Sequence, residues 1–241
     1  MKLIIVRHGD PDYEHDSLTE KGFREAELLK NYISKIKVDE FYCSPLGRAQ
    51  RTSEPTLKLL GKSAETLSWL KEFWGYIIDP KTGNQRIPWD LMPAEWTDYE
   101  ELYHKDNWRE NSVIKSGTFL KVYDEVCGEL DRFLSDHGYV KENNCYKAVK
   151  PNKGTVLFFC HFGIEMILLS RIIGVSPIVL WHNFVCLPTG ITTIQTEERE
   201  EGVAIFRIRG FGELPHLYEA GEVPSQKASF CELFSDKDGR H

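Results

Sequence analysis

The stretch LIIVRHG at residues 3–9 decides the fold of this chain. Four consecutive apolar residues are typical of a strand buried on both faces, as the strands of parallel α/β sheets are. A cation, an imidazole and a residue without a side chain follow directly, as Arg7, His8 and Gly9. Ligands of open α/β sheets bind at the carboxyl ends of strands. The stretch therefore predicts a phosphate site, and the alternative is an ordinary strand end followed by a turn.

Two later segments also follow an apolar run and carry a basic or imidazole side chain. SPLGRAQRT at residues 44–52 follows a short apolar stretch and carries Arg48, and CHFG at residues 160–163 follows the apolar run VLFF and carries His161. Three strand ends thus supply two guanidinium groups and two imidazoles. In a chain with a formal net charge of −7, cations placed in this way indicate a local anion site. The alternative for each arginine is a surface salt bridge.

Length and composition restrict the class of protein. A chain of 241 residues with 41% hydrophobic residues can bury the core of one large α/β domain. The net negative charge argues against a nucleic-acid partner. No apolar stretch approaches the roughly 20 residues that span a bilayer, and nothing near the start resembles a secretory signal. We therefore expect no membrane partner and a cytoplasmic location, and the sequence carries no signal for an oligomeric state.

Cysteine and histidine spacing gives no sign of a metal site. The six cysteines are scattered without the close pairs of zinc sites, and the histidines lack ligand spacing, so we expect reduced thiols, no metal and no cofactor. Cys160 adjoins His161 and could be proposed as a nucleophile. It follows a buried run, however, and we interpret it as core packing.

Hydrophobic spacing and turn residues predict alternating strands and helices. An insert at about residues 74–112 is rich in aromatic and turn residues and is interpreted as a cap, and most of its tryptophans are expected to form a satellite core. The tail at about 212–241 is expected to wrap the domain or to be loosely ordered. The other predicted elements are a helix at 18–36, a strand at 39–43, a helix at 46–60, an extended connector at 65–70, a short helix at 91–104, a helix at 117–137, a polar connector at 138–153, a helix at 165–173, and a hairpin of 191–195 with 203–209.

Together with LTEKG at residues 18–22, the three strand-end segments resemble the histidine phosphatase superfamily, which includes cofactor-dependent phosphoglycerate mutases and many phosphatases. The resemblance covers most of residues 1–209. It implies a single domain over 1–241, built as a three-layer α/β/α sandwich around a mostly parallel central sheet. It also implies a phosphorylated small molecule as the substrate.

The chemistry of these residues suits phosphoryl transfer. A neutral imidazole at His8 can attack phosphorus if its other nitrogen is held as a donor by a neighbouring acceptor. Arg7 and Arg48 can neutralise phosphoryl oxygens, and Gly9 removes bulk where backbone approaches the oxyanion. His161, if protonated, adds another donor, and the helix that follows it adds a favourable dipole.

The family resemblance also implies a proton donor. LKEFWG at residues 70–75 resembles the segment that carries this group, which makes Glu72 the candidate general acid and base. The alternative for Glu72 is an exposed strand-end carboxylate. Glu165, four residues after His161, is a weaker rival for the role.

The sequence departs from the family pattern in two places. Many members have a longer loop after the first motif, with amide side chains that help hold phosphate, whereas here a short loop carries Asp10 and Asp12. Two carboxylates would repel phosphate unless they turn outward or orient Arg7. The third motif has Phe162 in place of the commoner glycine, which predicts a reshaped pocket mouth. Basic residues of the insert, Arg86 and Arg109, are candidates for a second anionic group or for solvated surface charges.

The function predicted from these residues is a metal-independent phosphomonoester hydrolase with a phosphohistidine on His8. A phosphoglycerate mutase-type phosphotransferase is the nearest alternative, although the segments after Gly9 and His161 do not resemble those of glycolytic mutases. A non-catalytic phospholigand-binding protein is the alternative from another class, kept open by the short first loop.

Overall fold

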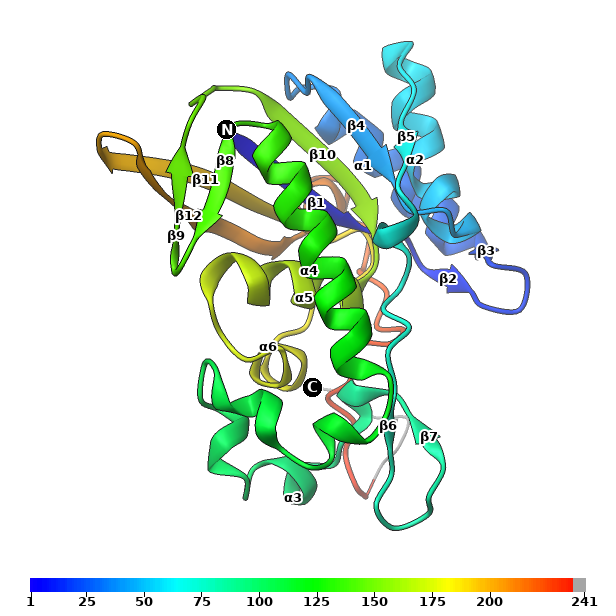
Figure 1. The fold of residues 1–241 in the computed structure, drawn as a ribbon. Helices are drawn as coiled ribbons and strands as arrows, with labels where there is room; N and C mark the ends of the chain where they lie inside the picture. The colour runs from blue at the N-terminus through cyan, green and yellow to red at the C-terminus, as the bar shows by residue number, and fades with distance from the viewer. Residues whose placement is uncertain (236–241) are drawn as a thin grey trace.

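A mixed sheet forms the middle layer of the computed structural model, which describes residues 1–235 (Figure 1). Its strands are β1 (Lys2–Arg7), β4 (Glu40–Cys43), β5 (Glu65–Thr66), β8 (Tyr139–Glu142), β9 (Cys145–Ala148), β10 (Thr155–Cys160), β11 (Ile191–Glu200) and β12 (Val203–Glu213). They lie in the order β5-β4-β10-β1-β11-β12-β9-β8. The two strands that end in the predicted site, β1 and β10, are therefore neighbours at the centre of the sheet.

Only one half of the sheet is parallel. β5, β4, β10 and β1 pair in parallel, whereas every pairing from β11 to β8 is antiparallel. The sheet is therefore mixed and not mostly parallel, because the predicted hairpin of 191–195 with 203–209 joins β1 in antiparallel pairing. Residues 138–153, expected as a polar connector, add the hairpin β8–β9 to this half. Tyr139 and Tyr146 are buried on this hairpin and anchor it to the sheet, but its strands are too short for their alternation to stand out in the sequence.

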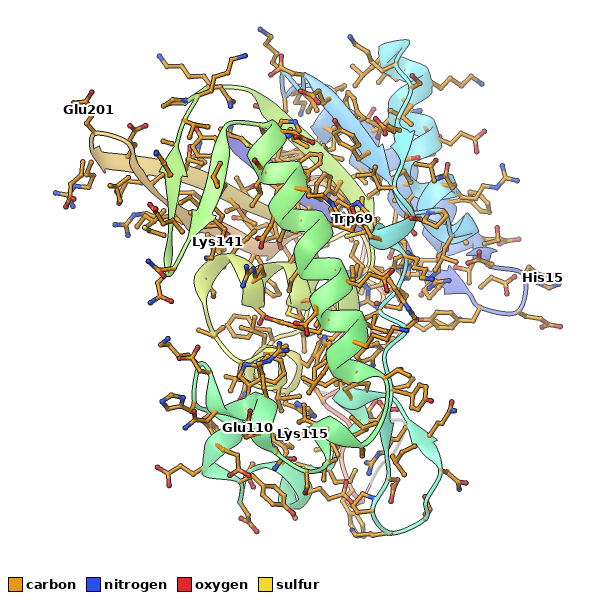
Figure 2. All side chains as sticks on the ribbon, viewed as in Figure 1. His15, Trp69, Glu110, Lys115, Lys141 and Glu201 are labelled. Atoms are coloured by element: carbon orange, nitrogen blue, oxygen red, sulfur yellow. The ribbon has the colours of Figure 1, made fainter. Side chains whose placement is uncertain are left out.

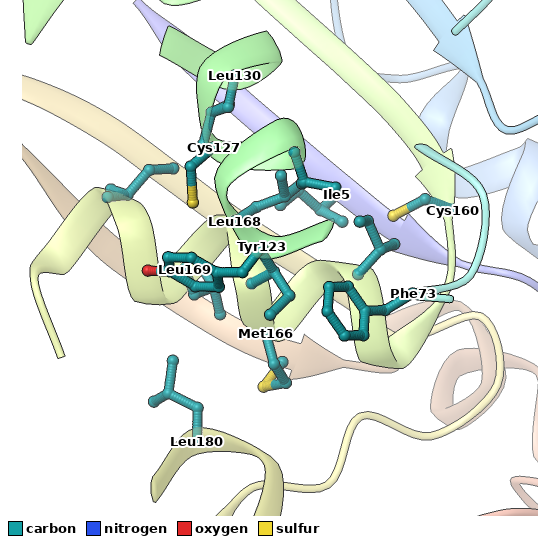
Figure 3. Close-up of a cluster of buried hydrophobic side chains, with 14 of the residues drawn as sticks. Ile5, Phe73, Tyr123, Cys127, Leu130, Cys160, Met166, Leu168, Leu169 and Leu180 are labelled. Atoms are coloured by element: carbon teal, nitrogen blue, oxygen red, sulfur yellow. The ribbon is translucent and has the colours of Figure 1, made fainter. Parts of the chain in front are cut away.

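Helices cover both faces of the sheet. They are α1 (Glu20–Ile33), α2 (Gly47–Leu60), α3 (Pro93–Trp96), α4 (Phe119–Asp136), α5 (Phe162–Ile173), α6 (Pro177–Asn183) and α7 (Pro215–Ala220). Alternate residues of β1 point into two cores: Leu3 and Ile5 pack with α4 and α5, whereas Ile4 and Val6 pack with α1 and α2. Figure 3 shows the first of these cores, with Ile5 beside side chains of α4 and α5. The expected three-layer α/β/α arrangement is confirmed.

Several element boundaries differ from the predicted ones. The helix predicted at 18–36 begins at Glu20, because the Thr19 side chain accepts the Gly22 N–H and caps it there. Leu18 lies instead in the short strand β3 (Ser17–Leu18), which pairs with β2 (Pro11–Asp12). The helix predicted at 165–173 begins at Phe162, directly after the third strand end. The helix α6 was not predicted.

The insert at 74–112 has little regular structure. It contains the hairpin β6 (Ile77–Ile78) and β7 (Gln85–Arg86), the helix α3 and short 3-10 turns, and Figure 1 shows it beside α6. The helix predicted at 91–104 is reduced to α3 and a 3-10 turn at Glu100–Leu102. Trp96 and Trp108 are buried in the core shared with α4 and α5, which agrees with the satellite-core interpretation for these two side chains.

The tail begins with the end of β12 and the helix α7, which packs on α1. Residues 222–235 follow without regular helix or strand, and the end of the predicted tail, 236–241, lies outside the described residues. No helix within residues 1–235 combines the length and the apolar character that a membrane crossing requires.

Candidate active site

His8 follows β1 directly and is almost fully buried, with 1% of its surface exposed. Its backbone N–H donates to the Cys160 carbonyl at 2.9 Å, and its Nδ1 lies 2.8 Å from the Gly9 carbonyl oxygen. Because a carbonyl only accepts, Nδ1 carries the proton and Nε2 keeps its lone pair. Burial, together with the charges of Arg7 and Arg48, holds the pKa of His8 well below its usual value. The ring is therefore a neutral imidazole at pH 7.

His161 lies beside His8, with the two ring centroids 5.1 Å apart. Its Nε2 lies 2.7 Å from the Ser44 hydroxyl, which itself accepts the Leu46 N–H at 3.2 Å. The Ser44 proton is thus free to point at Nε2, which leaves the ring proton on Nδ1. Burial and the neighbouring His8, Arg48 and Arg7 lower the pKa of His161 well below its usual value. The expected protonated donor is in this structure a neutral N–H donor.

Two arginines approach the same pair of imidazoles. Arg7 is 2% exposed and Arg48 is 9% exposed, and the charges of both contribute to the lowered pKa values of His8 and His161. The Arg48 Nη1 donates to the Asp16 carboxylate at 2.7 Å. Among the described residues, the buried Nε of each arginine and the Nδ1 of His161 have no hydrogen-bond partner. Unpaired buried N–H donors are costly, so these three, on two arginines whose charges act on His8 and on the histidine beside it, indicate an anion site.

Glu72 reaches this cluster from the turn that follows the 3-10 helix Ser68–Leu70. Its Oε1 accepts the Phe73 N–H at 2.8 Å and the Ile164 N–H at 3.0 Å, which joins this turn to the first turn of α5. Burial raises the pKa of Glu72, although these N–H groups and the charges of Arg48 and Arg7 oppose the shift. Glu72 is thus a partly buried carboxyl group inside the arginine and histidine cluster, and not an isolated surface carboxylate.

Gly163 is a supporting residue that sequence reasoning missed. A Cβ built on it would lie 2.6 Å from the Glu72 Oε1 and 2.7 Å from the Trp89 ring. Only glycine leaves room for the carboxyl group and the indole at this helix start. The glycine in CHFG was the available signal, and it was not assigned a role because its neighbours come from distant segments.

Gly9 lacks a side chain for a reason other than the predicted one. A Cβ on Gly9 would lie 2.9 Å from the Gly22 carbonyl oxygen of α1, so the glycine permits close packing of the loop on this helix. Its N–H donates to the Thr52 hydroxyl at 2.9 Å, and that hydroxyl donates to the Arg48 carbonyl at 2.7 Å. The Gly9 amide is therefore engaged within the protein and is not a free donor for an anion.

The two carboxylates considered in the sequence analysis, Asp10 and Asp12, turn away from the cluster, whereas Asp16 of the same loop pairs with Arg48. Asp10 is buried and accepts hydrogen bonds from the hydroxyl groups of Thr19 and Ser225. Asp12 lies 2.8 Å from His15 at the tip of the loop between β2 and β3, and Figure 2 shows His15 pointing away from the sheet. Asp10 and Asp12 therefore do not oppose an anion at the unpaired donors, whereas Asp16 partly neutralises the charge of Arg48.

Three charged residues considered in the sequence analysis have other partners. Arg86 pairs with Asp79 and Glu95 inside the insert, and Arg109 forms a bidentate pair with Asp124 of α4. Glu165, the rival proton donor, is fully buried in α5 near Thr192 and Cys186, and among the described residues neither of its carboxyl oxygens has a hydrogen-bond partner. Burial raises its pKa to about 7.

The buried position of Glu165 predicts a pH-dependent stability. In the unfolded chain this carboxyl loses its proton near pH 4.3, whereas in the folded protein it does so near pH 7. Between these values the folded state binds more protons, so the contribution of Glu165 to stability falls as pH rises. Relative to wild type, the Glu165→Gln variant should therefore gain up to about 3 kcal/mol of unfolding free energy between pH 4.5 and pH 8.

Urea denaturation of both proteins across this range measures the difference. The lowered pKa values of His8 and His161 act in the opposite direction, but they are shared by both proteins and cancel. Glu201→Gln, in the exposed turn after β11, serves as the control. Its unfolding free energy relative to wild type should not change across this pH range. If the difference in unfolding free energy between Glu165→Gln and wild type is also independent of pH, the conclusion that burial raises the pKa of Glu165 is wrong.

Comparison with known proteins identifies the family. Residues 3–109, which contain the first two strand-end motifs and Glu72, match the model of the histidine phosphatase superfamily (branch 1). Residues 3–109 belong to the histidine phosphatase superfamily. A probable phosphatase from Schizosaccharomyces pombe is 22% identical over 234 residues, which cover 90% of this chain and 95% of that protein. The adenosylcobalamin/alpha-ribazole phosphatase of Escherichia coli is 23% identical over 192 residues, which cover 76% and 84%.

Solved structures of the superfamily share the fold. A phosphoserine phosphatase from Entamoeba histolytica, solved in complex with phosphoserine, aligns over 90% of this chain and 98% of its own, with a TM-score of 0.58 and 20% identity. A mycobacterial glucosyl-3-phosphoglycerate phosphatase aligns over 88% and 98% with a TM-score of 0.57 and 16% identity. The histidine phosphatase relatives support phosphatase activity in general for this protein.

Proposed function

We propose that this histidine phosphatase hydrolyses phosphomonoesters through a transient phosphohistidine on His8. The observation that carries the proposal is the set of three buried, unpaired N–H donors next to a neutral imidazole. These donors are the Nε of Arg7, the Nε of Arg48 and the Nδ1 of His161. Charge on the transferring phosphoryl group spreads over its equatorial oxygens, and donors already in place stabilise it without reorganisation.

In the first half-reaction, the His8 Nε2 lone pair attacks phosphorus. The N–P bond forms while the bond to the ester oxygen breaks, and the electron pair of that bond remains on the leaving oxygen. Glu72 donates its proton to this oxygen, which leaves as an alcohol. The raised pKa of Glu72 supports this role, because an acid that keeps its proton to higher pH is available as a donor.

In the second half-reaction, the Glu72 carboxylate accepts a proton from water. The water oxygen attacks phosphorus, the N–P bond breaks, and its electron pair returns to Nε2. Inorganic phosphate leaves, and His8 and Glu72 regain their starting protonation states. The positive charge for both steps comes from the two arginines, so the reaction requires no metal and should continue in the presence of a chelator.

Trapping the intermediate tests this proposal. After brief mixing with a ³²P-labelled phosphomonoester and an alkaline quench, we expect a label on His8 that is stable to alkali and lost in acid. Release of inorganic phosphate should follow. An isomeric phosphoester in place of inorganic phosphate would indicate a mutase-type phosphotransferase, and phosphate binding without any label or turnover would indicate a non-catalytic protein. Either of these outcomes would overturn the proposed hydrolase.

A further inference from the structure

Residues 222–235, here called the C-terminal strap, are fastened to the loop that follows His8. The Ser225 side chain, in a residue 5% exposed, donates to the Asp10 carboxylate, and the Ser225 N–H donates to the Glu25 Oε1 at 3.2 Å. Glu25 is fully buried in α1, and its Oε2 accepts the Asp10 N–H at 2.8 Å. One pair of buried carboxyl groups thus holds both the active-site loop and the strap.

Beyond this anchor the strap crosses the phosphate-binding cluster. The Lys227 Nζ donates to the Pro11 carbonyl at 2.6 Å, on the same loop. The carbonyl oxygen of Ala228 then lies 3.4 Å from both Nη1 and Nη2 of Arg7. The strap therefore faces the terminal nitrogens through which an arginine ordinarily binds a phosphate in bidentate fashion, and Nη1 is shared with the Cys186 carbonyl, to which it also donates.

An aromatic contact also holds the strap beside Arg7. The Phe230 ring lies 5.6 Å from the Phe162 ring, and Phe162 in turn lies beneath the Arg7 guanidinium at 5.8 Å. Phe162 stands where the family pattern usually has glycine. At that position this chain therefore has an aromatic ring on which the strap packs. Arg7 is left with 2% of its surface exposed.

The backbone of the strap at this point has an unfavourable conformation. Ala228, Phe230 and Cys231 have φ values of 51°, 60° and 63°, in the left-handed region that residues with a Cβ rarely adopt. Such conformations persist where surrounding contacts hold them, and here those contacts are the Ser225 anchor and the ring of Phe162. A strap held in this way can leave Arg7 when a stronger partner competes for it.

We propose that the C-terminal strap is an autoinhibitory contact that competes with phosphate for Arg7. A phosphate dianion forms charge-assisted hydrogen bonds to a guanidinium group and is a stronger partner than a neutral peptide carbonyl. Substrate binding therefore displaces the Ala228 carbonyl from Arg7. The free energy needed for this displacement lowers the affinity of the protein for phosphate. This inference rests on the proposed function, because it takes Arg7 as a phosphate ligand.

Binding of inorganic phosphate, measured by calorimetry, tests the competition. A variant that ends at Glu222 lacks the rest of the strap but keeps the Glu222 contact with Lys21, and it should bind phosphate about 5- to 10-fold more tightly than the full chain. Ser225→Ala loses the two contacts of the hydroxyl group, with Asp10 and with the Lys227 N–H, and should shift affinity in the same direction by about 2- to 5-fold. Phe230→Ala should behave like Ser225→Ala, whereas Phe234→Ala, at a fully exposed ring of the same strap, should match wild type.

Hydrogen exchange gives a second readout that does not depend on truncation. In the full chain, saturating phosphate should increase exchange at the amides of Ser225 and Lys227, which are bonded to Glu25 and to the Ser225 hydroxyl. Equal or weaker phosphate binding by the Ser225→Ala and Phe230→Ala variants, or slower exchange with phosphate, would overturn the autoinhibitory strap while leaving the proposed hydrolase intact. If neither the full chain nor the shortened chain binds phosphate, the proposed function fails as well.

Discussion

Replacing His8 with alanine should abolish turnover of every phosphomonoester that the wild-type protein hydrolyses. The substitution removes the protein atom that forms a bond to phosphorus in the proposed reaction, the Nε2 that remains unprotonated because Nδ1 donates to the Gly9 carbonyl. Loss of a nucleophile costs on the order of 10⁴- to 10⁶-fold in kcat where the residue acts as part of a unit. Steady-state phosphate release measures the loss, and the trapping experiment should show no label.

A matched control separates chemistry from folding. His137→Ala also removes a partly buried imidazole, one that stacks on Phe133 at 4.2 Å at the end of α4, and it should retain wild-type turnover. Phosphate binding by His8→Ala should persist, because Arg7, Arg48 and His161 remain. Turnover by His8→Ala within tenfold of wild type, with a label still forming elsewhere in the chain, would assign the nucleophile to another residue.

Glu72→Gln should lower kcat by about 10²- to 10⁴-fold on alkyl phosphates, the usual range for loss of a general acid or base. The glutamine keeps an oxygen that accepts the N–H groups of Phe73 and Ile164, so the local structure is retained. The first half-reaction should be nearly normal with p-nitrophenyl phosphate, because this leaving group departs without a proton. The second half-reaction still lacks its base, so the variant should accumulate labelled phosphoenzyme from this substrate.

Rapid-quench measurements with the two substrates test this assignment. The raised pKa of Glu72 also predicts a pH dependence. The wild-type rate on alkyl phosphates should decrease above the pKa of this acid, because the deprotonated carboxyl cannot donate a proton. The rate of the Glu72→Gln variant should not show this decrease. Glu165→Gln provides the comparison, since Glu165 is the rival carboxyl. A leaving-group-dependent loss in Glu165→Gln and none in Glu72→Gln would reverse the two roles.

The residues of the candidate site could be selected from the sequence because each follows a local pattern. Apolar runs that end abruptly in polar residues mark buried strands wherever they occur, and strands of one α/β sheet end at a shared edge. Arg7 and His161 were selected in this way, and the pairing of β1 with β10 places their strands side by side. Glu72 lies in a turn without such a pattern and was found only through the family resemblance.

The missed elements share a physical cause. The hairpin β8–β9 and the helix α6 are short, and they are stabilised by burial of a few large side chains, such as Tyr139, Tyr146 and Trp181, against distant parts of the chain. Propensity and periodicity act over a few residues, so they carry little information about elements of this kind. The hairpin β8–β9 extends the antiparallel half of the sheet, which begins with the predicted hairpin at β11 and β12.

The sequence by itself determined the two central strands, the helices with clear amphipathic spacing, and the arginine and histidine side chains at the strand ends. Only the tertiary structure decided which nitrogen of each imidazole carries the proton, why Gly9 and Gly163 must be glycines, and that a carbonyl 221 residues away faces Arg7. The physical reason is that strands and helices arise from local backbone and side-chain preferences. Hydrogen-bond partners, by contrast, depend on which distant segments packing brings within about 3 Å of each other.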